Sequence, residues 1–109
     1  MHNENIVSMV LAVLDEGKGR DVTVIDVRNR TDFTDYMIVA SGTSDRHVRS
    51  LAFQVLEKAK QENMPYHGLE GEGDGEWVLV DLGDAVIHVM KPQAREFYQL
   101  EKLWQGQEA

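Results

Sequence analysis

The first periodic stretch of the chain has apolar residues at intervals of three and four, the spacing of one face of an α-helix. These residues are Ile6, Met9, Val10, Val13 and Leu14. Gly17 and Gly19 come next, and glycine commonly marks the end of a helix. The pattern therefore predicts an N-terminal helix with one buried face.

Two stretches rich in β-branched residues follow this helix. Residues 21–27 alternate in part between polar and apolar side chains, whereas residues 36–40 are continuously apolar. A short apolar run of this kind suits a strand that is covered on both faces. We therefore predict two strands, the second of them fully buried.

The middle of the chain contains the clearest helical stripe. Its apolar members are Val48, Leu51, Ala52, Val55, Leu56 and Ala59. Thr43 or Ser44 is suited to cap the start of this helix, and Asn63 with Pro65 marks its end. The pattern predicts a second amphipathic helix.

The C-terminal half predicts a hairpin and a last helix. The Gly- and acid-rich residues 68–75 suit a loop or a short edge strand. Residues 76–82 and 85–90 suit two strands joined by Gly83 and Asp84, and Pro92 suits the first position of a helix. The whole order, α, β, β, α, one or more β, then α, predicts a single α/β domain.

The expected hairpin has two different faces, because residues opposite each other in paired strands share a side of the sheet. A turn at Gly83 and Asp84 places Leu82 opposite Ala85. One face is then wholly aliphatic and predicted to be core: Val78, Val80, Leu82, Ala85, Ile87 and Val89. The other face is mixed: Trp77, Leu79, Asp81, Val86, His88 and Met90.

This mixed face has two interpretations, and periodicity alone favours neither. Tryptophan and methionine are enriched where proteins recognise proteins, so the face suits an interface centred on Trp77. Alternatively, the C-terminal helix covers the face from within the same chain, with these side chains: Tyr98, Leu100, Leu103 and Trp104. An exposed apolar face would also favour a homodimer of the free protein.

Composition narrows the class of protein. The 109 residues include no cysteine, and their 42% hydrophobic and 28% charged content is ordinary for one soluble domain. No apolar run approaches the ~20 residues of a membrane helix, and residues 1–5 do not resemble a secretory signal, so we expect a cytoplasmic protein. The net charge of -8 disfavours DNA or other naked nucleic acid as the partner and favours a basic protein.

Residues 40–44 raise the question of catalysis, because they lead from a predicted strand into a helix as in nucleotidyltransferases. Such enzymes need a close pair of carboxylates, where this chain has Asp81 alone on the following strand. The acidic residues 70–76 lack the spacing of an EF-hand, and the histidines lack metal-ligand spacing. We therefore predict no catalytic residues, no metal and no cofactor.

Several segments together resemble a known family. The most specific are residues 76–84 (Glu-Trp-Val-Leu-Val-Asp-Leu-Gly-Asp), residues 86–90 (Val-Ile-His-Val-Met) and residues 100–104 (Leu-Glu-Lys-Leu-Trp), in this order. Further matches are Asp35-Tyr36, residues 41–44 with 46–48, Glu70-Gly71, Arg95 and Tyr98. Over nearly its whole length the chain resembles the ribosomal silencing factor family (RsfS, also called Iojap-like).

The resemblance implies a nucleotidyltransferase-like fold without catalytic carboxylates. In this α/β (α+β) fold, residues 1–109 form a single domain, with a mixed sheet of about five strands flanked by helices and Gln105–Ala109 as a flexible tail. It further implies binding to the large ribosomal subunit through ribosomal protein uL-fourteen, which sterically blocks the small subunit and represses translation under nutrient limitation. The alternatives are a large-subunit assembly factor and a nucleotide-binding enzyme.

The resemblance favours the interface interpretation of the mixed face. Trp77 and Met90 are expected to anchor the partner, and Asp81 is expected to face its basic groups. His88 either donates a hydrogen bond across the interface or positions Asp81. The full set of expected contact residues is Trp77, Leu79, Asp81, His88, Met90, Lys91, Tyr98, Glu70 and Asp84.

Overall fold

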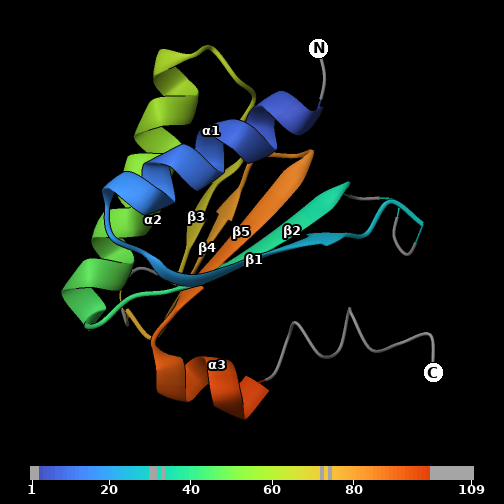
Figure 1. The fold of residues 1–109 in the computed structure, drawn as a ribbon. Helices are drawn as coiled ribbons and strands as arrows, with labels where there is room; N and C mark the ends of the chain where they lie inside the picture. The colour runs from blue at the N-terminus through green and yellow to red at the C-terminus, as the bar shows by residue number, and fades with distance from the viewer. Residues whose placement is uncertain (1–2, 30–31, 33, 72, 74, 99–109) are drawn as a thin grey trace.

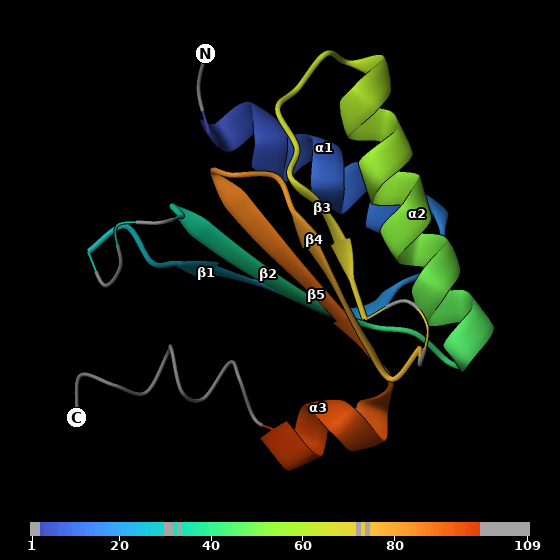
Figure 2. The same cartoon turned by 180° about the vertical axis from the view of Figure 1, so that it is seen from behind.

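The computed structural model describes residues 3–29, 32, 34–71, 73 and 75–98. Within these residues the chain forms one α+β domain, in the order α1, β1, β2, α2, β3, β4, β5, α3 (Figure 1). Helices α1 (Asn3–Glu16) and α2 (Asp45–Gln61) cover one face of the sheet, and α3 (Pro92–Tyr98) lies on the other side (Figure 2). The predicted fold class, a mixed sheet flanked by helices, is confirmed.

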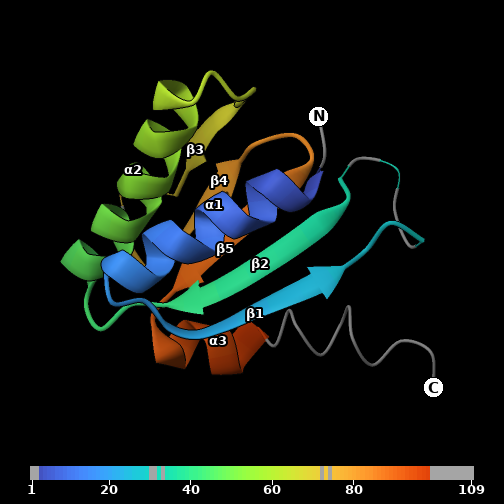
Figure 3. The ribbon, with the colours of Figure 1, turned by 45° about the horizontal axis from the view of Figure 1, so that its top comes forward.

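The described residues contain one five-stranded sheet. Its strands are β1 (Arg20–Asp26), β2 (Tyr36–Ser41), β3 (Gly68–Glu70), β4 (Trp77–Asp81) and β5 (Ala85–Met90). They lie in the order β1-β2-β5-β4-β3 (Figure 3), with β2 and β5 parallel and the other neighbours antiparallel. The continuously apolar stretch of the sequence is thus an inner strand, and every residue of β2 after Tyr36 is buried.

The hairpin of β4 and β5 has the register that the sequence predicts. Trp77 pairs with Met90 at its open end. At the turn, the backbone N–H of Leu82 donates to the carbonyl oxygen of Ala85 at 2.9 Å. Gly83 has a φ of 84°, a left-handed value that glycine adopts without strain. The two faces of the hairpin therefore carry the side chains expected of them.

Residues 68–75, which were expected to form a loop or a short edge strand, contain both. Strand β3 pairs antiparallel with β4 and places Glu70 opposite Leu79. Gly71 follows with a φ of 89°, and a Cβ at this position would overlap the carbonyl oxygen of Trp77. Glycine is needed here because the chain leaves the sheet in close contact with the first residue of β4.

The main core lies between the sheet and the two helices α1 and α2. It unites the apolar faces predicted for both helices with the aliphatic face of the hairpin. Its large, fully buried side chains include Leu14, Ile38, Leu51, Leu82 and Ile87. At the start of α2, the side-chain oxygen of Ser44 accepts a hydrogen bond from the backbone N–H of His47 at 3.1 Å. Ser44, one of the two residues considered, is therefore the cap.

Candidate interaction surface

A second, smaller apolar cluster lies on the face of the sheet opposite α1 and α2. Its buried members come from the region of β1, from β2, from β5 and from α3: Ile25, Val27, Met37, Val39, Met90 and Ala94. Trp77 is partly buried and packs against this cluster. Part of the mixed hairpin face is therefore covered by α3, as the second interpretation of that face proposed.

Arg95 fixes α3 to the sheet. Its Nη1 donates a hydrogen bond to Oγ of Ser41 at 2.9 Å, and its Nη2 donates to Oγ1 of Thr23 at 3.0 Å. Both hydroxyl groups lie on an otherwise apolar side of β1 and β2, because Thr23 pairs with Val39 and Ser41 follows Val39 by two residues. This contact is not predicted by the sequence patterns described above, although the hydroxyl groups of Thr23 and Ser41 at inward-facing positions are a usable signal.

We expect Arg95→Ala to lower the free energy of unfolding by about 1.5 kcal/mol, because hydrogen bonds from a charged donor contribute on this scale. Urea unfolding followed by circular dichroism would measure the loss. Gln93→Ala changes an exposed position of the same helix and is the matched control. Equal stability of the two variants would contradict the role assigned to Arg95.

Next to the covered region, four residues of β3 and β4 form a more open surface. Trp77, Leu79 and Asp81 alternate along β4 and are partly buried, while Glu70 is exposed opposite Leu79. We call Glu70, Trp77, Leu79 and Asp81 the hairpin surface. It combines an indole, an aliphatic side chain and two carboxylates on one side of the sheet.

A buried histidine of the neighbouring strand, His88, fixes the orientation of the Trp77 indole. Its Nε1–H donates a hydrogen bond to Nδ1 of His88 at 2.9 Å, and the two ring centroids lie 5.7 Å apart with a tilt of 48°. His88 is 6% exposed, and burial lowers its pKa from 6.5 to about 4. The imidazole is therefore neutral at pH 7, with its proton assigned to Nε2 because Nδ1 accepts from the indole.

Burial removes two residues from the expected contacts. Met90 is 0% exposed and belongs to the second cluster, and His88 is almost as deeply buried. The expectation that they touch a partner is corrected: Met90 is core, and His88 supports Trp77. Oδ1 of Asp81 accepts from the backbone N–H of Gly83 at 2.9 Å, and the positioning of Asp81 by His88 stays a prediction.

Lys91 lies just after β5 and interacts with acidic side chains of the same chain. Its Nζ is 2.8 Å from Oδ1 of Asp45 and 3.5 Å from Oε2 of Glu76. The hydrogen bond between Lys91 and Asp45 raises the pKa of the lysine and lowers the pKa of the carboxyl group. Lys91 therefore links the start of α2 to the start of β4, and its contact with a partner stays a prediction.

Two further expected contacts lie apart from the hairpin surface. Asp84 is exposed at the turn, at the opposite end of the hairpin from Trp77. Tyr98 is the last residue of α3, and its side chain is outside the described part of the structure. The described part of the structure also excludes the other residues expected to cover the mixed face and the expected tail. These are Leu100, Leu103, Trp104 and Gln105–Ala109.

The hairpin surface presents apolar and acidic side chains next to each other. Among the described residues, no group of three or more His, Asp or Glu side chains lies close enough together to hold a metal ion. Within the same residues, no helix has the length and apolar character needed to cross a membrane. What the surface offers is apolar area from a fixed indole, flanked by carboxylates.

The comparisons with known proteins decide the family. A family model described as "Ribosomal silencing factor during starvation" matches residues 1–109. The chain belongs to this family. The resemblance found in the sequence is thereby confirmed, and the family description is that of a regulatory factor rather than an enzyme.

Relatives of this ribosomal silencing factor family match over most of the chain. RsfS of Haemophilus influenzae is 41% identical over 99 residues, which are 91% of this chain and 97% of that protein. Mitochondrial assembly of ribosomal large subunit protein 1 of Mus musculus is 38% identical over 101 residues, 90% of this chain and 44% of the mouse protein. A crystal structure from Chromobacterium violaceum has a TM-score of 0.94 and 42% identity, and the match covers 98% of this chain and 89% of that one.

Proposed function

We propose that this chain binds the large ribosomal subunit through ribosomal protein uL-fourteen and blocks association with the small subunit, so that translation in the cytoplasm falls under nutrient limitation. The hairpin surface is the proposed contact. The observation that carries the proposal is the partly exposed indole of Trp77, which is held by a buried histidine and flanked by carboxylates. Family membership supports the same conclusion.

The physical properties of the surface suit a basic protein partner. An aromatic side chain whose orientation is already fixed loses little conformational entropy on binding, which favours affinity. Glu70 and Asp81 supply negative charge beside it, and the net charge of -8 favours encounter with a basic surface. In this proposal Trp77 and Leu79 bind an apolar part of the partner, while the carboxylates pair with lysine or arginine.

The size of the domain makes a steric mechanism sufficient. Its principal extents are 34 × 34 × 21 Å. Contacts between two packed surfaces form only when atoms approach to about 4 Å. A body of this size on the face of the large subunit that meets the small subunit would therefore keep the two surfaces apart, with no chemical reaction involved.

Sedimentation with purified subunits tests the proposal. We expect the protein at micromolar concentration to migrate with the large subunit and not with the small subunit, and to lower the fraction of joined ribosomes when both are present. Protein that stays unbound at that concentration would refute the proposed function.

A second candidate function is large-subunit assembly. The observation that favours it is the name of the mouse relative, which describes mitochondrial assembly of the large subunit. Profiles of precursor particles in a strain that lacks this protein separate the two functions. Accumulated large-subunit precursors would support assembly, whereas normal precursors with excess joined ribosomes in starved cells would support silencing.

A further inference from the structure

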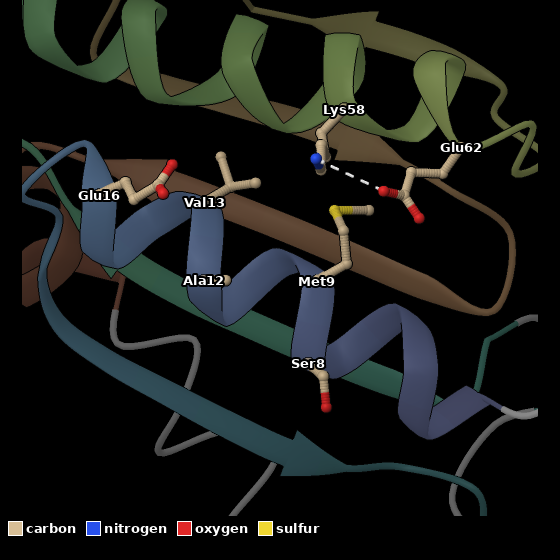
Figure 4. Close-up of a pocket in the computed structure, with 7 residues that line it drawn as sticks. All are labelled: Ser8, Met9, Ala12, Val13, Glu16, Lys58 and Glu62. Carbon is tan, nitrogen blue, oxygen red and sulfur yellow. Dashed lines mark ion pairs between the residues drawn. The ribbon is translucent and has the colours of Figure 1, made fainter.

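A groove lies between α1 and α2, on the side of the domain opposite the hairpin surface. One part of it has a volume of about 370 Å³ and is bordered by both helices (Figure 4). Met9 and Val13 point from α1 toward α2, and Lys58 and Glu62 reach from α2 with an ion pair of 3.4 Å between them. The groove therefore has an apolar floor and a charged border.

A second depression continues the first. This second depression has a volume of about 550 Å³, and three of its lining residues, Ser8, Met9 and Glu62, also line the first. It extends toward Met64 and the hairpin turn at Asp84. Along α1 the combined lining runs from Asn5 to Glu16. At 1.5 Å per residue this length is roughly 17 Å, the length of about three turns of a second helix.

We use the name α1–α2 groove for the surface formed by Met9, Val13, Met64, Glu16, Glu62 and Asp84. Its apolar part includes two methionines, whose flexible side chains adapt to the shape of a bound helix. Its charges are mainly negative, because Lys58 is already paired with Glu62. Glu16 and Asp84, at opposite ends of the groove, have no ion-pair partner among the described residues.

We propose that the α1–α2 groove binds an amphipathic helix of about three turns that belongs to a basic protein. The apolar stripe of that helix would lie on Met64 and on the edges of Met9 and Val13 that line the groove, while most of these two side chains stays in the core. Lysine or arginine near the two ends of the helix would pair with Glu16 and Asp84. An apolar floor with acidic ends is complementary to such a helix. Nucleic acid does not fit, because its phosphates would face these carboxylates.

The consequence is a protein with two independent docking faces. Helices α1 and α2 cover one face of the sheet (Figures 1 and 2), and the groove is lined by their side chains. The hairpin surface lies on the other face, where Trp77 packs against the second cluster. One partner on each face can therefore be held at the same time. This inference goes beyond the proposed function and does not depend on it, because the groove can be tested without ribosomes.

Methionine methyl signals in nuclear magnetic resonance provide the test. The protein, labelled with ¹³C at the methionine methyl groups, is titrated with a stapled helical peptide of leucine and alanine that carries lysine at both ends. We expect the signals of Met9 and Met64 to shift, while those of Met37 and Met90, in the cluster on the other side of the sheet, stay unchanged. The same peptide with glutamate in place of lysine is expected to cause no shift.

Charge variants test the two ends of the groove. Glu16→Lys combined with Asp84→Lys is expected to weaken peptide binding at least tenfold, because both variants place positive charge opposite the lysines of the peptide. Glu96→Lys, an exposed position on α3, makes the same kind of change on the opposite side and should leave binding unchanged. Equal binding of the acidic peptide, shifts confined to Met37 and Met90, or a shift of Met9 caused by an RNA oligonucleotide would each overturn the proposal.

Discussion

Trp77→Ala is expected to weaken binding to isolated large subunits by about 2 kcal/mol or more, the scale of a tryptophan hot spot at a protein interface. The substitution removes the apolar centre of the hairpin surface and leaves Nδ1 of His88 without the donor seen 2.9 Å away. Sedimentation or biolayer interferometry with purified subunits would measure the change in Kd. The domain should still fold, because Trp77 packs at the edge of the second cluster and takes no part in the main core.

Phe53→Ala is the matched control for this prediction. Phe53 is 47% exposed on α2, so the variant removes an aromatic ring from the opposite side of the domain. We expect its affinity for the large subunit to equal that of the unmodified protein. A folded Trp77→Ala protein with unchanged affinity would show that the hairpin surface is not the contact, even if the protein itself binds.

The second large effect is on stability at acid pH. We expect the free energy of unfolding to fall by about 3 kcal/mol between pH 6.5 and pH 4, because the pKa of His88 is about 4 in the folded protein and 6.5 as a free side chain. Between these values the unfolded chain binds a proton that the folded chain does not, so stability rises with pH across this window. Protonation would also turn Nδ1 into a donor facing the indole N–H, which breaks the hydrogen bond to Trp77.

Urea unfolding at several pH values would measure this loss. His88→Asn keeps an acceptor near Nδ1 and cannot take up the proton, so its stability should depend much less on pH in this window. His67→Asn removes an exposed histidine and is the matched control. If the free energy of unfolding of His88→Asn fell as steeply with decreasing pH as that of the unmodified protein, groups other than His88 would cause the acid sensitivity.

Most of the fold could be predicted because local patterns and the final architecture agree. The spacing of Val48, Leu51 and Val55 predicts which face of α2 is buried, and Gly83 with Asp84 predicts the register of the hairpin. Both are properties of short segments, which depend only on the periodicity of helices and strands. The two sides of the hairpin were predicted correctly for the same reason.

The burial of Met90 and His88 could not be predicted from the hairpin alone. Alternation tells which side of a strand a residue lies on, but not which distant element covers that side. Here β2 lies beside β5, and α3 folds back over it, which places Met37 and Ala94 against Met90 in one cluster. The grouping of Trp77, Leu79 and Asp81 on one surface was foreseen, while their contact with a partner stays a prediction.

The strand order also determines when the domain can be completed. Strand β5 is the last strand of the described residues, yet it lies between β2 and β4. Before Ala85–Met90 is available, the strands can form only two separate ribbons, β1 with β2 and β3 with β4, and isolated two-stranded ribbons are marginally stable in water. Synthesis must therefore pass Met90 before the sheet can close, because the two ribbons are joined only through β5.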